Sequence, residues 1–443
     1  MTLTFETLAL FPAAMTLVLA CAAPAVAQYP QDSGGALEIG GLYRAAIDAD
    51  PRFHALQLQA DQTALRLRNI EAERLPAIVA EGQAQYQSDV PTAPILGPGG
   101  QPLFSTPKDT YDAHLRIDQR LLDKTIQPRL AAERAQLAEA QARIRTALFG
   151  LRQEVNEAFF SAALLQERAG TLAATVKDLE GRLDEMNVRV REGASLAADA
   201  AAIEATLLER RQDEAELRAT RRGALARLSR LTGRAMAETD LLQLPELTAA
   251  VMQARAAVDA TRARPEYDQF ARTRERLARQ QEVATAQDQP RISAFARVGY
   301  GRPGLNFISD QFESYGLAGL QVQWKAWNWG TTNREREALA LQQQIVADDE
   351  AAFTRGLGRS TEADLAAIDR LTTALALDDR IIALREEIER SMQARFQERV
   401  VTAAEYLDRS AELLQAQFAR AGHRVELAQA SARFLTTLGL EVR

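Results

Sequence analysis

The chain has 443 residues and a formal net charge of −7, with three histidines and one cysteine. It is rich in alanine, leucine, arginine, glutamate and glutamine, a composition that favours long amphipathic helices. There is no basic excess, so the charge balance does not favour binding to nucleic acid.

The N-terminal stretch, residues 1–27, reads as a signal peptide. It is mostly apolar and small, and Ala25-Val26-Ala27 followed by glutamine fits the A-x-A cleavage pattern. The stretch before Met15 contains no lysine or arginine, although a signal peptide usually begins with a basic segment. One open alternative is therefore that the apolar core of the signal peptide begins near Met15. Lipidation of Cys21 is a second open alternative. In either case the mature chain is expected to have no disulfide and no thiol chemistry.

Four later segments alternate between apolar and polar side chains, as strands with one apolar face do. Their apolar faces consist of Ile78, Ala80, Gly82, Ala84 and Tyr86; of Tyr111, Ala113, Leu115, Ile117 and Leu121; of Ile292, Ala294, Ala296, Val298 and Tyr300; and of Leu320, Val322 and Trp324. Strands of about ten residues suit a tilted crossing of a bilayer. A bilayer tolerates no unpaired backbone groups, so such strands must close into a barrel, and four strands need further copies of the chain to do so. A soluble antiparallel sheet with one wet face is the open alternative.

All three tryptophans, Trp324, Trp327 and Trp329, lie at the end of the last strand segment. The indole ring is apolar while its N–H needs a polar partner, so tryptophan favours the lipid–water boundary. We take the three as candidate membrane-interface residues. Ordinary core packing is the alternative for each one taken singly.

Apolar residues at intervals of seven predict very long helices. One row consists of Leu130, Leu137, Ile144, Leu151, Ala158, Leu165, Leu172, Leu179 and Met186, and a second row runs four residues behind it from Leu148 to Val190. At about 1.5 Å per residue this stretch is a rod of about 90 Å. A second rod is expected from Gly330 to Gln397, loosened in the middle by Gly356 and Gly358. Returning helices are expected over Ser195–Leu231 and Thr402–Leu438.

The chain is an internal duplication. Pro51 and Pro76 are 25 residues apart, and so are Pro265 and Pro290, with a tyrosine ten residues after the second proline of each pair. Each half therefore predicts a helix, a strand pair, a very long helix and a returning helix. We divide the chain into the signal peptide (residues 1–27), a first structural repeat (residues 28–233), a linker (residues 234–247) and a second structural repeat (residues 248–443).

No enzyme is visible in the sequence. The histidines His54, His114 and His423 fall in three different elements, so neither a zinc site nor a Cys–His pair is expected. The glycines at 299, 301 and 304 match the dinucleotide-binding spacing, but no helix is expected to follow them, so a turn at a strand tip explains them better. We expect no cofactor.

The order and spacing of these pieces resemble the TolC family of outer-membrane efflux and secretion channels. The matching pieces are Asp50-Pro51, Leu75-Pro76, Leu121-Leu122-Asp123 and the closing Leu435–Gly439. The resemblance implies a mainly α fold with a transmembrane β-barrel portion. It implies a homotrimer in which each protomer adds four strands to one 12-stranded β-barrel. The internally duplicated long antiparallel helices would form an α-helical barrel. It also implies a place in the outer membrane of a Gram-negative bacterium, in contact with lipid, with a periplasmic helical extension.

The same resemblance implies a passive exit duct in a tripartite efflux pump or a type I secretion system. Its partners would be a periplasmic adaptor (membrane fusion) protein and an inner-membrane pump or ABC transporter. In the family, acidic residues three apart face the pore at the inner end of the tunnel, and the matching positions are Glu405 and Asp408. Arg395 and Arg399 precede them and are candidates to pair with these acids and hold the tip closed. The alternative is that both acids are solvated residues of a first helical turn, where the dipole favours them.

The second function that stays open is a periplasmic coiled-coil adaptor or scaffold protein of a transport complex. It predicts one strand hairpin instead of two, and a small soluble sheet. The exported substrate, whether drug, metal or protein, is not encoded in any motif of the chain.

Overall fold

The computed structural model describes residues 36–90, 107–258, 262–305 and 310–442. These residues belong to one unit, Ala36–Arg443. The expected signal peptide and Cys21 lie outside the described residues, as does most of the proline-rich segment between the first two strands.

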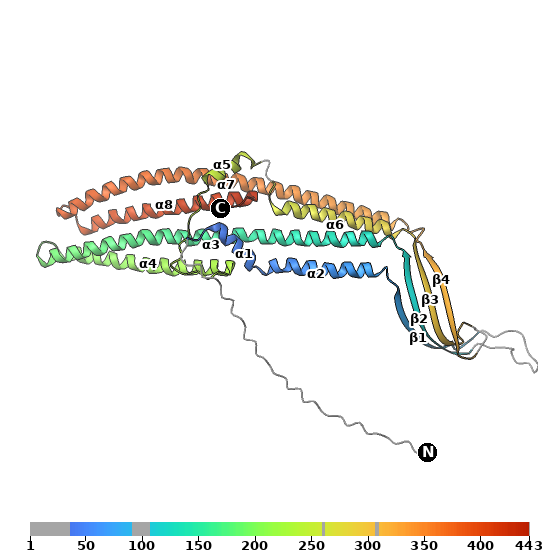
Figure 1. The fold of residues 1–443 in the computed structure, drawn as a ribbon. Coiled ribbons are helices and arrows are strands. Elements are labelled where there is room, and N and C mark those ends of the chain that lie inside the picture. Colours follow the sequence, from blue (N-terminus) through green and yellow to red (C-terminus); the bar gives the residue numbers. More distant parts are fainter. Residues whose placement is uncertain (1–35, 91–106, 259–261, 306–309, 443) are drawn as a thin grey trace, which may run out of the picture. The chain divides into compact units, whose positions relative to one another are not determined.

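The same order of elements occurs twice along the chain (Figure 1). The first series is α1 (Ile39–Ala49), α2 (Pro51–Ala72), β1 (Ala77–Tyr86), β2 (Asp109–Leu122), α3 (Ile126–Arg191) and α4 (Ala197–Thr232). The second is α5 (Thr248–Ala256), α6 (Pro265–Gln287), β3 (Arg291–Arg302), β4 (Glu313–Gln323), α7 (Thr331–Gln397) and α8 (Ala403–Leu438). The boundaries of the two repeats as domains stay a prediction.

Local signals in the sequence set the starts of the helices. Pro51 and Pro265 occupy the first turns of α2 and α6, where the missing N–H costs nothing. The Asp50 carboxylate accepts a hydrogen bond from the Arg52 amide at 2.8 Å and caps α2. The long helices α3 and α7 have 66 and 67 residues.

α7 is a continuous helix through its two central glycines, Gly356 and Gly358, and the expected bend or loosening there stays a prediction. Phe353 lies just before them and packs edge-on against Tyr267 and Phe270 of α6, with ring centres 5.5 and 5.8 Å apart. A glycine costs a helix only about 1 kcal/mol relative to alanine. The contacts of Phe353 with α6 therefore support the helix at the level of these glycines.

The four strands form one antiparallel sheet in the order β1-β2-β3-β4. The register pairs Ala77 with Asp118, and β3 joins the two hairpins by pairing alongside β2. One face of the sheet is apolar and exposed, with Ile78 and Leu320 each 71% accessible. Within the described residues, the outer edges of β1 and β4 have no partner strand. Two hairpins in one sheet do not fit the adaptor alternative, which predicts a single one.

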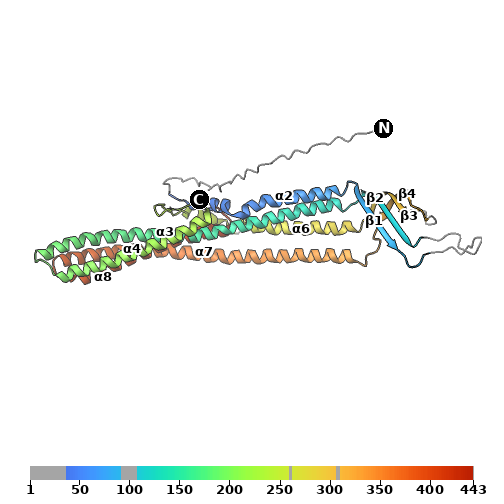
Figure 2. The ribbon, with the colours of Figure 1, turned by 90° about the horizontal axis from the view of Figure 1, so that it is seen from below.

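The helices lie side by side in two different sets (Figures 1 and 2). Next to the sheet, in what we call the sheet half, the order across the molecule is α2, α3, α6 and α7. In the tip half, which ends at the two helix reversals, the order is α4, α3, α8 and α7. α3 and α7 run through both halves, and α1 and α5 lie near the level where the sets change.

Two apolar clusters hold the helices together. The larger lies where the two halves meet and includes the buried side chains Tyr43, Phe159, Phe160 and Phe434. The smaller lies near the helix reversals and includes Leu179, Ile203 and Tyr406. Of the helices in the described parts of the chain, none is both long enough and apolar enough to cross a membrane.

Candidate functional site at the tip and the strand–helix junctions

The tip consists of two reversals of equal length, residues 192–196 and 398–402. In the first, Ala194 donates its amide to the Arg189 carbonyl at 2.7 Å, and in the second Val400 donates to the Arg395 carbonyl at 2.9 Å. The left-handed position is occupied by Gly193 (φ +71°) in the first reversal and by Arg399 (φ +61°) in the second. The left-handed conformation costs a non-glycine residue about 1–2 kcal/mol. The second reversal is therefore the more strained one.

Glu405, one of the two predicted acids, is part of the cap of α8. The Thr402 amide donates to Glu405 Oε2 at 2.9 Å, and the Glu405 amide donates to Thr402 Oγ1 at 3.3 Å. The backbone hydrogen bond from Thr402 holds the pKa of Glu405 below its usual range. Thr-x-x-Glu before a helix is a capping-box signature, which sequence reasoning about the acids missed. Asp408 is exposed one turn further along α8.

The two predicted gate-tip arginines belong to the same reversal as these acids, on the α7 side of it. Arg395 is in the last turn of α7, and Arg399 is in the reversal that follows it. Among the residues with described positions, neither forms an ion pair with Glu405 or Asp408. Any such pairing between separate copies of the chain stays a prediction.

A different set of side chains ties the helices together just above the tip, and we call it the tip cluster: Asp178, Arg182, Glu389 and Tyr406. The buried Tyr406 hydroxyl of α8 donates to Glu389 Oε1 of α7 at 2.7 Å. The Arg182 guanidinium of α3 lies 3.6 Å from Glu389, 2.6 Å from Asp178 and 5.0 Å from the centre of the Tyr406 ring. Burial raises the pKa of Tyr406, so the phenol stays protonated and donates.

Sequence reasoning missed the tip cluster because more than two hundred residues separate Arg182 from Glu389. The cluster joins α3 to α7 and α8 directly. It therefore links the two helical hairpins to each other near their ends.

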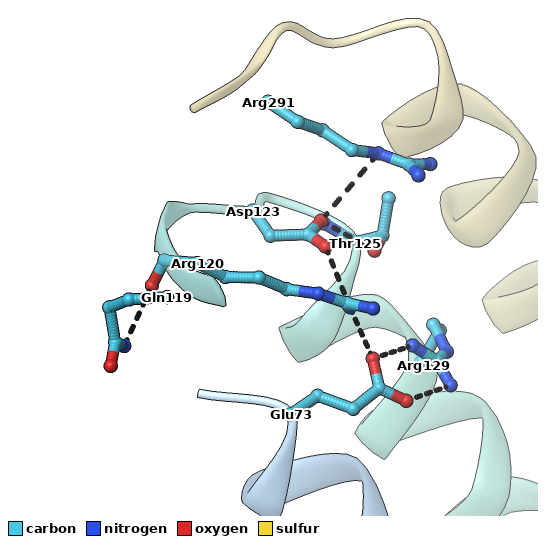
Figure 3. Close-up of polar contacts among 7 residues, drawn as sticks. All are labelled: Glu73, Gln119, Arg120, Asp123, Thr125, Arg129 and Arg291. Carbon is cyan, nitrogen blue, oxygen red and sulfur yellow. Dashed lines mark hydrogen bonds and ion pairs between the residues drawn. The ribbon is translucent and has the colours of Figure 1, made fainter. Parts of the chain in front are cut away.

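At the opposite end of the rods, a network of charges joins the first strand pair to its helices (Figure 3). Glu73 follows α2 and receives two hydrogen bonds from Arg129 of α3, at 2.6 and 2.7 Å. Arg120, near the end of β2, donates to both Glu73 and Asp123. The hydrogen bonds from Arg129 lower the pKa of Glu73. Figure 3 shows Arg120 and Arg129 converging on this one carboxylate.

The second junction repeats this layout with mostly neutral groups. Asp288 follows α6 and accepts from Asn328 Nδ2 and from Thr332 Oγ1, both at 2.9 Å. Asn328 Oδ1 accepts from the Gly330 amide at 3.0 Å, as Asp123 Oδ1 accepts from the Thr125 amide at 2.9 Å. Each strand pair is thus fixed to its long helix by a carboxylate at the end of the preceding short helix.

The three tryptophans lie at this second junction, between β4 and α7. Trp324, Trp327 and Trp329 are 62%, 75% and 79% accessible, so the core-packing alternative does not apply to the protomer. Trp324 Nε1 donates to the Asp288 carbonyl at 3.0 Å, which holds its ring at the strand end. Their place at a membrane surface stays a prediction.

On the polar face of the sheet, four residues lie at one level on consecutive strands: Glu81, His114, Gly299 and Tyr315. His114 Nδ1 lies 2.6 Å from Asp112 and Nε2 lies 3.1 Å from Glu81. The Tyr315 ring covers Gly299, where a Cβ would come within 2.7 Å of the ring, and its hydroxyl donates to Asp112. No group of three or more His, Cys, Asp or Glu side chains in the described ranges is arranged to hold a metal ion.

Comparison with known proteins agrees with this architecture. Residues 42–234 match the family described as Outer membrane efflux protein. No curated protein sequence matches the chain. These findings, together with the solved structures below, confirm the resemblance inferred from the sequence.

Several solved structures share the fold over most of its length. CusC is 15% identical with a TM-score of 0.66, covering 91% of this chain and 92% of CusC. VceC, an outer membrane protein of Vibrio cholerae, is 14% identical with a TM-score of 0.64, covering 91% and 97%. MtrE, an outer membrane channel of Neisseria gonorrhoeae, is 18% identical with a TM-score of 0.64, covering 91% and 89%. At these identities the likeness is one of fold.

Proposed function

We infer that this chain, which carries the outer membrane efflux protein match over residues 42–234 and the fold of the TolC-like channels, is an outer-membrane channel. It acts as the passive exit duct of a tripartite efflux pump or a type I secretion system. The observation that supports this most strongly is the sheet, whose two free edges and exposed apolar face are attached to two very long helical hairpins.

The sheet requires further copies of the chain. A strand edge exposes unpaired N–H and C=O groups, and in a bilayer every one of them needs a partner. Three copies of the four strands make the 12-stranded barrel of a homotrimer. Ile78, Leu115, Val298 and Leu320 then face lipid, and the row with His114 and Tyr315 faces the water-filled interior. The tryptophans at the β4–α7 junction mark the membrane boundary, where indole is favoured.

The helices extend this barrel into the periplasm. The 66 residues of α3 make a rod of about 100 Å at about 1.5 Å per residue. The two structural repeats, residues 28–233 and 248–443 with residues 234–247 between them, each supply one such hairpin. The tip of the rods is the end that an adaptor protein and an inner-membrane pump reach. Such a duct is passive, and the inner-membrane pump with its adaptor supplies the energy and the substrate.

At the tip, three copies of Glu405 and Asp408 surround the entrance. A ring of carboxylates in a narrow passage attracts cations. Arg395 and Arg399 stand beside this ring, and in the trimer they pair with acids of a neighbouring copy and narrow the entrance. The Thr402 hydrogen bonds keep Glu405 ionised, which favours cation binding.

The test is conductance of the purified full-length mature protein in planar bilayers, together with its location after cell fractionation. We expect outer-membrane material that forms pores blocked by di- and trivalent cations from the tip side. Replacing Glu405 and Asp408 by alanine abolishes the block. Glu387→Ala, which removes an exposed acid of α7 that makes no ion pair with a described residue, leaves it unchanged.

Three results would contradict the proposal or a part of it. Protein found wholly soluble in the periplasm, or purified trimers without conductance, would end the channel assignment. Pores whose cation block survives the double alanine variant would end the acidic-ring assignment alone. Capture of the adaptor from native membranes then separates efflux from secretion.

A further inference from the structure

A groove opens where α3, α6 and α7 approach the sheet. Its volume is about 630 Å³, within the range of about 300–1,000 Å³ that small-molecule sites occupy. Lys124 and Arg336 contribute positive charge to its lining. Pro128 and Ala278 contribute apolar surface. Gln281 Nε2 donates to the Arg336 carbonyl at 3.0 Å, so α6 fixes the turn of α7 that carries Arg336. We call this site the junction groove.

The two cations of the junction groove have no anion of their own. Lys124 and Arg336 are both exposed, and neither is in an ion pair with another described residue. Glu282 is the one carboxylate among the described lining residues, and Arg279 already engages it at 2.8 Å. A groove with two free cations and an engaged carboxylate attracts an anion.

Lysine is rare in this chain and is concentrated around the sheet. Four of the 53 lysine and arginine residues are lysines. Lys108 precedes β2 at the end of the sheet away from the helices, and Lys124 and Lys325 lie at the helix end. A lysine can lay its stem along apolar surface and keep its ammonium among polar headgroups. Three of four lysines therefore stand where the ends of membrane-embedded strands would meet headgroups.

The junction groove lies on the side of the helices that faces away from the polar face of the sheet. Arg120, on the polar face of β2, reaches Glu73, and Arg129 binds the same carboxylate (Figure 3). Arg129 lines a different groove together with Val283 of α6. Thr285 lines the junction groove, and two residues along a helix turn the side chain by about 200°. The two grooves therefore lie on opposite sides of α6, and the junction groove continues the apolar face.

A tryptophan lies beside the junction groove on this apolar side. Trp324 follows Leu320 and Val322 on the apolar face of β4, and all three are exposed. Its Nε1 donates to the Asp288 carbonyl at 3.0 Å. Gln289, the next residue of the chain, lines the junction groove. The groove therefore begins at the level where an indole ring favours the lipid–water boundary.

We propose that the junction groove binds the phosphodiester headgroup of an anionic phospholipid in the periplasmic leaflet of the outer membrane. Lys124 and Arg336 bind the phosphate oxygens, and the Gln289 amide contacts the polar end of the headgroup. Each cation close to an anionic lipid surface raises affinity roughly fivefold. The inference rests on the proposed function for the position of the membrane and adds a ligand to it. Free phosphate shares the charge of this ligand and is the competing occupant.

Tryptophan fluorescence provides the test, because the three tryptophans of the sequence all lie at this junction. The purified full-length mature trimer in a nonionic detergent is titrated with short-chain phosphatidylglycerol, with short-chain phosphatidylcholine and with inorganic phosphate. The phosphatidylcholine arm measures binding that needs no net negative charge. The inorganic phosphate arm separates a free anion from a lipid.

Three double variants accompany the unaltered protein. Lys124→Gln with Arg336→Gln removes both charges of the groove, and Lys124→Arg with Arg336→Lys keeps them. Lys177→Gln with Arg359→Gln is the matched control. It removes one exposed lysine of α3 and one exposed arginine of α7, each far along its helix from the sheet and in no ion pair with a described residue.

We expect phosphatidylglycerol to change the fluorescence saturably and to bind more tightly than phosphatidylcholine. Affinity for phosphatidylglycerol should fall about thirtyfold in the neutralised variant, because two contributions of roughly fivefold are lost. The charge-keeping variant and the matched control should bind as the unaltered protein does. Inorganic phosphate should neither change the fluorescence nor compete.

Equal affinity for the two lipids, or unchanged affinity for phosphatidylglycerol in the neutralised variant, overturns the junction groove as a lipid site. Competition by inorganic phosphate overturns the lipid and leaves a free anion as the ligand. Trimers that still conduct keep the proposed function intact in both cases, whereas protein that is neither trimeric nor conducting contradicts that function itself. If the neutralised variant does not assemble, the unaltered protein decides: its preference for phosphatidylglycerol must decline as salt is raised, and a preference independent of salt overturns the proposal.

Discussion

Tyr406→Phe removes one hydroxyl from the tip cluster and leaves its apolar packing in place. The ring remains stacked on Phe396, with centres 5.6 Å apart, and remains under the Arg182 guanidinium at 5.0 Å. What is lost is the 2.7 Å hydrogen bond to Glu389 of α7. The variant therefore isolates the polar tie between α8 and α7.

The size of the effect follows from the charge and burial of the partners. A hydrogen bond to a charged group contributes about 1.5–3 kcal/mol, and an abandoned acceptor keeps its desolvation penalty. The Glu389 side chain is 14% accessible and retains Arg182 at 3.6 Å, which places the loss at the lower end, about 1.5 kcal/mol. Since about 1.4 kcal/mol is a tenfold change in an equilibrium constant, local opening of the tip should become about tenfold more frequent.

Native-state hydrogen exchange measures this directly. Backbone amides of the first turns of α8 and the last turns of α7 should exchange about tenfold faster, while those of the sheet half do not change. The matched control is Tyr267→Phe, whose exposed hydroxyl bonds Thr354 at 3.1 Å between neutral groups. Tyr267→Phe should alter exchange at its own site less than threefold. Equal effects of the two variants, or no change at the tip in Tyr406→Phe, would refute the assigned role of the tip cluster.

Three further outcomes follow from the reversals, the first junction and a buried phenol. Gly193→Ala should destabilise the first reversal by about 1 kcal/mol, because φ at this position is +71°. Arg399→Gly should leave the stability of the second reversal unchanged or raise it, because glycine adopts a positive φ without strain. Faster hydrogen exchange at the tip in Arg399→Gly would contradict the strain assigned to Arg399. Arg129 lowers the pKa of Glu73, so this carboxylate adds stability above its ordinary pKa and loses it as pH falls through the lowered value. In Glu73→Gln the unfolding temperature should therefore decrease less steeply as pH is lowered below about 5. An unchanged dependence of the unfolding temperature on pH would contradict the stabilising role of the Glu73 carboxylate. Burial raises the pKa of Tyr43 above 10.0, so the contribution of this phenol to folding stability is complete below about pH 10 and declines at higher pH. Tyr43→Phe should lessen the loss of stability at high pH. An equal loss in the variant and the unaltered protein would contradict this role of Tyr43.

Much of the fold is readable from the sequence because its signals are local and repeated. Intervals of seven between apolar residues specify long helices wherever they occur, and α3 extends over the predicted stretch. The alternation of apolar and polar residues predicts all four strands, and two equal proline spacings indicate the duplication from the sequence alone. Family resemblance supplied Glu405 and Asp408, although Thr402-x-x-Glu405 also encodes a helix cap that the structure displays.

The tertiary structure decided what pairs with what. Periodicity marks an apolar face but does not say whether that face is covered inside the protomer. On α7, Leu371 is buried in the structure whereas Leu377 and Ile381 are exposed, although all three are apolar residues of one helix. The tip cluster joins residues more than two hundred positions apart, and Glu73 meets Arg129 across an entire strand pair. Contacts at such separation depend on how helices pack side by side, which the spacing of residues along one helix does not encode.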